Sequence, residues 1–177
     1  MNEAQRFFVK ERFGVTLKAS ELISVFGTKE VLFNFPQYFL HEKENPVMAY
    51  PNPFYQIYEG AAIASRAKVI HLNLTKENAF KPDIRLPELK NADLIILNFP
   101  NNPTTSVLSI DELGEWVKFA LEHDIVLLND ECYSEIFVDE KPPSLLEASL
   151  HVGNESFKNI LVINSISKRS SAPGLRS

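Results

Sequence analysis

The sequence predicts an α/β domain with a mostly parallel sheet, because short apolar runs alternate with longer amphipathic stretches. The short runs are rich in Ile, Leu and Val, as expected of strands that are covered on both faces. No internal repeat interrupts this order, and 177 residues are enough for one domain. The expected strands are Leu22–Phe26, Val47–Tyr50, Val69–Leu72, Leu94–Asn98, Ile125–Asn129 and Ile160–Asn164.

Helices are expected between these runs. The first covers Asn2–Phe13 and ends at Gly14, a residue that often follows the last turn of a helix. Thr28–Leu40 and Phe54–Ala64 are also predicted to be helical, with Pro36 expected to kink or end the earlier one.

A further helix begins at Ser109, which forms a capping box with Glu112. Apolar residues then recur at helical spacing and predict a face that packs on the sheet. They are Leu113, Trp116, Val117, Ala120 and Leu121.

Charge and composition exclude several classes of function. A net charge of −5 argues against a nucleic-acid partner, whose phosphates require clustered Lys and Arg. Cys132 is a single cysteine and cannot form an internal disulfide, which favours a reducing, cytoplasmic location. The histidines lie far apart, so no metal site is predicted. No apolar run approaches the length of a membrane span, and no membrane partner is expected.

A candidate site begins with the segment SISKRSSAPGLR, which follows the strand expected at residues 160–164. Ligands of open α/β sheets bind beyond the carboxyl ends of strands. Lys168 could form a Schiff base there, while Ser165, Ser167 and Arg176 hold a phosphate. The alternative is a solvated basic loop.

Another strand ends in the segment NDECY. Asp130 follows four apolar residues, and a buried carboxylate at that position needs a partner such as a protonated heteroaromatic nitrogen. Tyr133, three residues later, could direct its hydroxyl to the same ligand. The alternative is that Asp130 caps the next helix.

Two further turns complete the set of candidates. In the segment NNPT, neighbouring prolines restrict the backbone around Asn102, although a bare turn has the same pattern. Gly27, Thr28 and Lys29 form a strand-to-helix turn whose free amides suit a phosphate, although an ordinary helix start explains them equally well.

In this order, these motifs closely resemble the large domain of fold-type I pyridoxal-phosphate enzymes of the class I/II aminotransferase family. The resemblance covers nearly the whole chain and implies a three-layer α/β/α sandwich around a mostly parallel sheet. The amino-acid sequences of three segments are most similar to bacterial succinyldiaminopimelate and aspartate aminotransferases. They are GTKEVLFNFPQ, NPFYQIYEGAA and SKRSSAPGLRS. This resemblance implies a role in lysine and diaminopimelate biosynthesis.

The resemblance implies pyridoxal 5'-phosphate as cofactor, with an amino acid and a 2-oxo acid as substrates. Lys168 is expected to bind the cofactor covalently and then to move a proton, and Asp130 to keep the pyridine nitrogen protonated. Tyr133 and Asn102 would hydrogen-bond the ring oxygen. Tyr55 would stack on the ring, with a core aromatic as its alternative. The phosphate is assigned to Gly27, Thr28, Lys29, Ser165, Ser167 and Arg176.

Family members continue NPT with glycine, whereas this chain has Thr105, which is expected to alter the turn without affecting Asn102. They also form homodimers and extend beyond both ends of these residues. Residues 1–177 therefore correspond to part of the cofactor-binding large domain, with the N-terminal arm and the C-terminal small domain absent, and are expected to be inactive alone. Two alternatives stay open: a truncated, inactive fragment, and a carbon–sulfur lyase or decarboxylase on the same scaffold.

Overall fold

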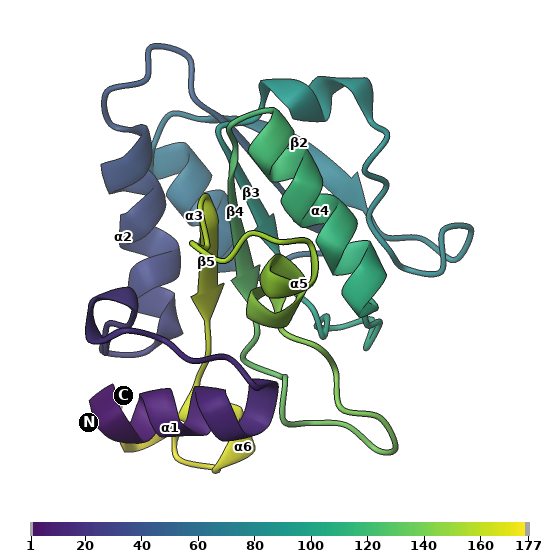
Figure 1. Cartoon of the computed structure of the whole chain (residues 1–177). Helices are drawn as coiled ribbons and strands as arrows, with labels where there is room; N and C mark the ends of the chain where they lie inside the picture. Colours follow the sequence, from purple (N-terminus) through teal and green to yellow (C-terminus); the bar gives the residue numbers. More distant parts are fainter. Residues whose placement is uncertain (1, 176–177) are drawn as a thin grey trace.

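In a computed structural model of the chain, which describes residues 2–175, helices cover both faces of a parallel sheet (Figure 1). The strands run in the order β2-β1-β3-β4-β5. Their bounds are β1 Val47–Asn52, β2 Lys68–Asn73, β3 Leu94–Leu97, β4 Val126–Asp130 and β5 Ile160–Ile163. The helices are α1 Asn2–Phe13, α2 Thr28–Leu40, α3 Gln56–Ala64, α4 Ile110–Glu122, α5 Leu145–His151 and α6 Ile166–Arg169. Short 3₁₀ turns cover Ala19–Glu21, Pro87–Asn91 and Pro173–Leu175.

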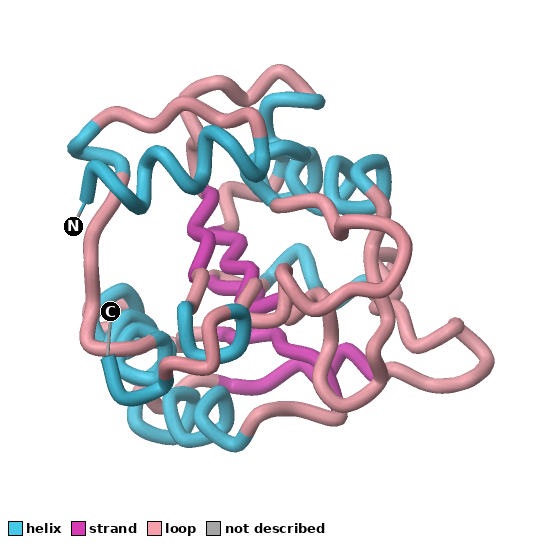
Figure 2. The backbone as a smooth tube through the Cα atoms, turned by 90° about the horizontal axis from the view of Figure 1, so that it is seen from below, coloured by secondary structure: helices cyan, strands magenta, loops and turns pink. Residues whose placement is uncertain are grey.

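The sheet separates two apolar cores, which gives the expected three layers. On one face α2 and α3 pack on the strands, with Leu32 and Tyr58 fully buried among them. On the other face α4 and α5 contribute Trp116 and Leu145. In Figure 2 the strands run through the middle of the molecule, with helices on either side. No helix in the described part of the chain is long and apolar enough to span a bilayer.

The capping box predicted at the start of α4 is confirmed. The Ser109 hydroxyl accepts a 3.2 Å hydrogen bond from the Glu112 amide, and the Glu112 carboxylate accepts one of 2.7 Å from the Ser109 amide. Lys81 also pairs with this carboxylate at 2.6 Å. The predicted apolar face packs on the sheet as expected. Gly14 ends α1 with a φ of 67°, a conformation that glycine adopts at low cost.

The strand predicted at Leu22–Phe26 is wrong. This segment is an irregular connection, and Ile23 and Phe26 are 82% and 76% exposed, whereas an inner strand of this sheet is buried on both faces. The Ser24 hydroxyl donates to Asn2 and Gln5, at 2.9 and 2.7 Å, so the segment lies against α1 instead of pairing with a strand.

The bounds predicted for α2 are confirmed, and one helix start differs from the prediction. α2 runs from Thr28 to Leu40 with the buried Pro36 inside it, so the proline does not end the helix. α3 begins at Gln56 rather than at Phe54, because the Phe54 ring turns to pack against the sheet.

Candidate active site

The predicted site residues lie beyond the carboxyl ends of neighbouring parallel strands. Asp130 ends β4, and the segments that follow β3, β4 and β5 carry Asn102, Tyr133 and Lys168. Parallel strands end at the same edge of a sheet. α1 and α6 lie beyond this edge in Figure 1. Arg169 of α6 stacks on Phe8 of α1, with its Cζ 3.8 Å from the ring centre, which fixes these two helices against each other.

Asp130 is the last residue of β4 and is 3% exposed. Its Oδ2 accepts a 2.9 Å hydrogen bond from the Tyr58 hydroxyl, and its Oδ1 accepts one of 3.3 Å from the Cys132 amide. Burial raises the pKa of the Asp130 carboxyl, and these hydrogen bonds oppose the rise. A turn follows, and the next helix, α5, begins only at Leu145, so Asp130 does not cap a helix.

Tyr58, which the sequence analysis did not identify, connects Asp130 to α3. Its side chain is fully buried, and burial together with the neighbouring Asp130 raises the pKa of its hydroxyl well above the usual value. Its ring contacts Tyr55 edge to face at 5.9 Å, and the Nζ atom of Lys29 lies 5.9 Å from the centre of the Tyr55 ring. The only sequence signal for Tyr58 was its spacing of three residues from Tyr55 on a helix.

Tyr55 packs against the apolar core and also contacts Lys29 at the start of α2. It immediately precedes α3 and packs at the margin of the apolar core on the α2 and α3 face. Its contact with Lys29 places the start of α2 beside it. The Gly27–Thr28–Lys29 turn forms that start: Gly27 is buried with a φ of 88°, and the Glu30 amide donates to its carbonyl at 3.2 Å.

Lys168 lies in α6, which follows β5. Its Nζ atom is 5.6 Å from the centre of the Tyr133 ring. The side chain is exposed, yet it is near enough to the strand end to oppose the rise that burial causes in the pKa of the Cys132 thiol. Lys168 and Tyr133 therefore lie together at the ends of β5 and β4.

Ser165 precedes α6 and is 6% exposed; its hydroxyl accepts the Ser167 amide at 3.1 Å. This contact orders the short helix that carries Lys168. The remaining phosphate candidate of this segment, Arg176, lies outside the described residues.

Asn102 is exposed, and a buried asparagine ties its backbone to β4. The Asn98 side chain accepts the Asn102 amide at 3.3 Å and donates to the Asp130 carbonyl at 2.9 Å. Asn98 was part of the predicted motif, but this role was not foreseen. Thr105 adopts a φ of 61°, and its amide donates to the Asn101 carbonyl at 2.9 Å. Thr105 thus adopts the left-handed conformation that glycine favours. The hydrogen bond from the Asn102 amide to the Asn98 side chain is present beside it.

Glu131 is a second buried carboxylate next to Asp130. It is 1% exposed, and burial raises its pKa to about 7. Its Oε1 accepts the Leu145 amide at 2.7 Å, the Ser144 hydroxyl at 3.2 Å and the Asn129 side-chain amide at 3.0 Å. Whereas Asp130 contacts α3, Glu131 contacts the start of α5 on the opposite face of the sheet.

We expect Glu131 to make the protein less stable as the pH rises. Its pKa of about 7 in the folded state exceeds the ordinary 4.5, so the folded state binds more protons between these values. The free energy of unfolding should fall by about 3 kcal/mol from pH 4.5 to above pH 7. Glu131→Gln should remove this slope in urea unfolding measured at pH 5, 6, 7 and 8. Equal slopes in both proteins would contradict the assignment.

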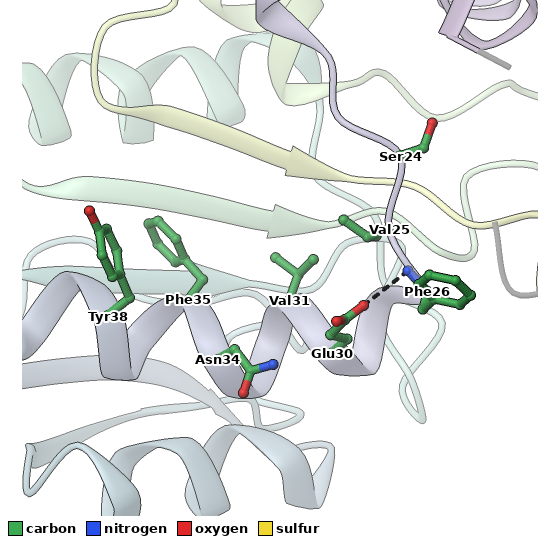
Figure 3. A pocket seen from close by; sticks show the side chains of 8 residues that line it. All are labelled: Ser24, Val25, Phe26, Glu30, Val31, Asn34, Phe35 and Tyr38. Carbon is green, nitrogen blue, oxygen red and sulfur yellow. Dashed lines mark hydrogen bonds between the residues drawn. The ribbon is translucent and has the colours of Figure 1, made fainter.

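A separate groove of about 400 Å³ lies along α2 (Figure 3). Figure 3 shows the side chains of Val31, Phe35 and Tyr38 along one side of this helix, with the Glu30 carboxylate accepting the Phe26 amide at 3.0 Å. None of the predicted cofactor residues lines this groove. Its apolar side chains indicate a surface for packing rather than for the chemistry at the strand ends.

The chain is similar to several known aminotransferases. The chain is 35% identical over 143 residues to an LL-diaminopimelate aminotransferase of Aquifex aeolicus, covering 78% of this chain and 36% of that protein. The aminotransferase AspB of Helicobacter pylori superimposes with a TM-score of 0.97 at 60% identity, over 99% of this chain and 47% of that one. An aminotransferase of Neisseria meningitidis gives a TM-score of 0.90 at 36% identity, over 99% and 46%.

The chain therefore spans less than half the length of these relatives. The sequence model of the family described as "Aminotransferase class I and II" matches residues 2–177. A match of this extent, with the strand-end arrangement described above, settles the classification. The chain belongs to the class I and II aminotransferase family.

Proposed function

We propose that the protein containing this chain transfers an amino group between an amino acid and a 2-oxo acid, with pyridoxal 5'-phosphate as cofactor. The observation that carries the proposal is the buried Asp130 carboxylate at the end of β4, with Lys168 over the ring of Tyr133 in the segment that follows it. Family membership supports the reaction class. The residues that bind and orient the reactants determine the chemistry, so the proposal rests on this site rather than on the fold.

The residues present fit this cofactor. Tyr58 and the Cys132 amide each supply one hydrogen bond to Asp130, whereas a carboxylate can accept about four. Burial disfavours the charged carboxylate, and a cationic ring nitrogen would compensate for this cost. When bound, pyridoxal 5'-phosphate supplies an electron sink for the carbanion formed from the amino acid.

We propose the following roles for the other residues. Lys168 holds the cofactor covalently and, once released, carries a proton on its Nζ atom. Tyr133 and Asn102 hydrogen-bond the ring oxygen, and Tyr55 stacks on the ring. The phosphate is bound at the start of α2 and beside α6, by Gly27, Thr28, Lys29, Ser165, Ser167 and Arg176.

We further propose that the protein is a homodimer in the cytoplasm and that it acts in lysine and diaminopimelate biosynthesis. Relatives named LL-diaminopimelate aminotransferase support the substrate class. The exposed apolar side chains of Phe26 and Tyr38, 76% and 85% exposed, support association with another subunit. The single cysteine favours a reducing compartment.

The test uses the complete protein, purified with pyridoxal 5'-phosphate. Addition of L-glutamate should change the visible absorbance of the bound cofactor, and a 2-oxo acid should restore it while a new amino acid appears by mass spectrometry. Release of ammonia and a 2-oxo acid without a new amino acid would instead identify a lyase. Absence of cofactor binding would contradict the proposal altogether.

A further inference from the structure

A buried polar network joins the loop after β3 to the loop after β4, on the face of the sheet opposite Asp130. At its centre Asn129, fully buried, accepts the Phe99 amide on Oδ1 at 3.1 Å and donates from Nδ2 to the Phe99 carbonyl at 3.2 Å. The same Nδ2 donates to Glu131 Oε1 at 3.0 Å. Glu131 thus orients the amide that holds both backbone groups of Phe99.

This network leads directly to the loop that carries Asn102. Phe99 follows Asn98, whose side chain binds the Asn102 amide and the Asp130 carbonyl. Asn129 therefore holds the Phe99 backbone, and the side chain of the preceding residue, Asn98, is hydrogen-bonded to the Asp130 carbonyl. Since both contacts lie within four residues of Asn102, the position of Asn102 depends on the orientation of the Asn129 amide.

Helix capping alone does not account for Glu131. The start of α5 already has two other caps, since the Ser144 hydroxyl accepts the Leu146 amide at 3.1 Å and the Glu147 carboxylate accepts the Ser144 amide at 2.8 Å. Glu131 is nevertheless buried as a carboxyl group, and its Oε2 has no hydrogen-bond partner among the described residues. Burying such a group has a cost in stability, and a retained polar group of this kind fixes one arrangement of its neighbours.

We propose that Glu131 is a positioning residue: through the Asn129 amide it fixes the Phe99 backbone, and with it Asn102, relative to the strand end that carries Asp130. This inference rests on the proposed function for its consequence, because Asn102 there binds the cofactor's ring oxygen. Its structural part is independent of that function and is measured separately.

The first measurement is hydrogen exchange of the segment 98–104 in the complete protein without cofactor. Glu131→Met keeps the side-chain volume, removes the acceptor and relieves the cost of a buried carboxyl group, so the protein should still fold. Exchange at the Phe99 amide should rise at least about tenfold. Glu131→Gln retains an acceptor oxygen for Asn129 and should restore slow exchange. The matched control is Glu147→Gln, which changes a carboxylate at the same helix start without touching Asn129.

Two results would overturn the proposal: unchanged exchange at Phe99 in Glu131→Met, or an equal rise in the Glu147→Gln control. Asn129→Ala provides a second route, since it should raise Phe99 exchange by itself, and adding Glu131→Met to it should change nothing further. An additive effect of the two substitutions would also contradict the proposal.

The second measurement concerns the cofactor. In the holoenzyme, the pH midpoint of the visible absorbance band should move upward by about one unit in Glu131→Met and return toward the wild-type value in Glu131→Gln, because a misplaced Asn102 stabilises the ring oxyanion less well. A rise in Phe99 exchange with an unchanged midpoint would overturn the assignment of Asn102 to the ring oxygen. Failure of every variant and of the wild type to bind cofactor would overturn the proposed function and leave the exchange result to decide the positioning role.

Discussion

Lys168→Ala is expected to abolish covalent attachment of the cofactor and amino-group transfer in the complete protein. The Lys168 side chain lies over the Tyr133 ring, in the segment that follows the buried carboxylate of Asp130. Alanine removes both the amine that binds the cofactor and the group that moves the proton, and loss of the proton transfer alone costs about 10²–10⁴-fold in rate. Absorbance spectra and mass measurement of the borohydride-reduced protein report the attachment.

Lys29→Ala is the matched control for this experiment. Lys29 is also an exposed lysine beside a tyrosine ring, with its Nζ atom 5.9 Å from the centre of Tyr55. It lies at the start of α2, where the backbone amide assigned to the phosphate is kept by alanine, so covalent attachment of the cofactor should persist. If Lys168→Ala keeps the band, or if Lys29→Ala loses it, the covalent role belongs to a residue other than Lys168.

Asp130→Asn is expected to leave the cofactor bound but to slow amino-group transfer by about 10²–10³-fold, since loss of one strong electrostatic contact in an active site costs about 3 kcal/mol or more. Asparagine has nearly the same shape and keeps an oxygen for the Tyr58 hydroxyl, which now lies 2.9 Å from the carboxylate. It cannot stabilise a protonated ring nitrogen by charge. Single-turnover kinetics with saturating amino acid measure the effect on the chemical step.

Tyr58→Phe separates the charge of Asp130 from its position. It removes only the hydroxyl that binds Oδ2 and keeps the ring that packs on Tyr55. The free energy of unfolding should fall by about 1–3 kcal/mol, because a buried carboxylate loses one donor. The rate should fall far less than in Asp130→Asn. Near-normal turnover in Asp130→Asn would show that this carboxylate has a structural role only.

The pattern of apolar and amphipathic segments in the sequence predicts most of the fold, but it does not predict the side-chain contacts of the candidate site. Ile, Leu and Val runs followed by amphipathic helices were sufficient to find β1 to β5, since burial on both faces leaves a local signature. The segment Leu22–Phe26 has the same composition and is not a strand, because a short apolar run does not record whether a neighbouring strand is available to pair with it.

The positions of Asp130, Tyr133 and Lys168 at strand ends follow from the pattern, whereas the Tyr58 and Asn129 contacts do not. Tyr58 meets a residue 72 positions away, and Asn129 meets Phe99 at a separation of 30. These pairs depend on the order of strands and on which face each side chain takes. A single sequence carries no local record of either.

The register of β4 sets the chemistry of this edge. Asp130 pairs with Ile163 of β5 and faces Tyr58, while the adjacent Glu131 faces α5. A slip of one residue that brought Glu131 to the place of Asp130 would move Asp130 to the place of Asn129, on the opposite face of the sheet. The same slip would turn buried Leu127 and Leu128 toward the wrong cores. The burial of Leu127 and Leu128 in opposite cores therefore fixes which of the two neighbouring acids faces Tyr58.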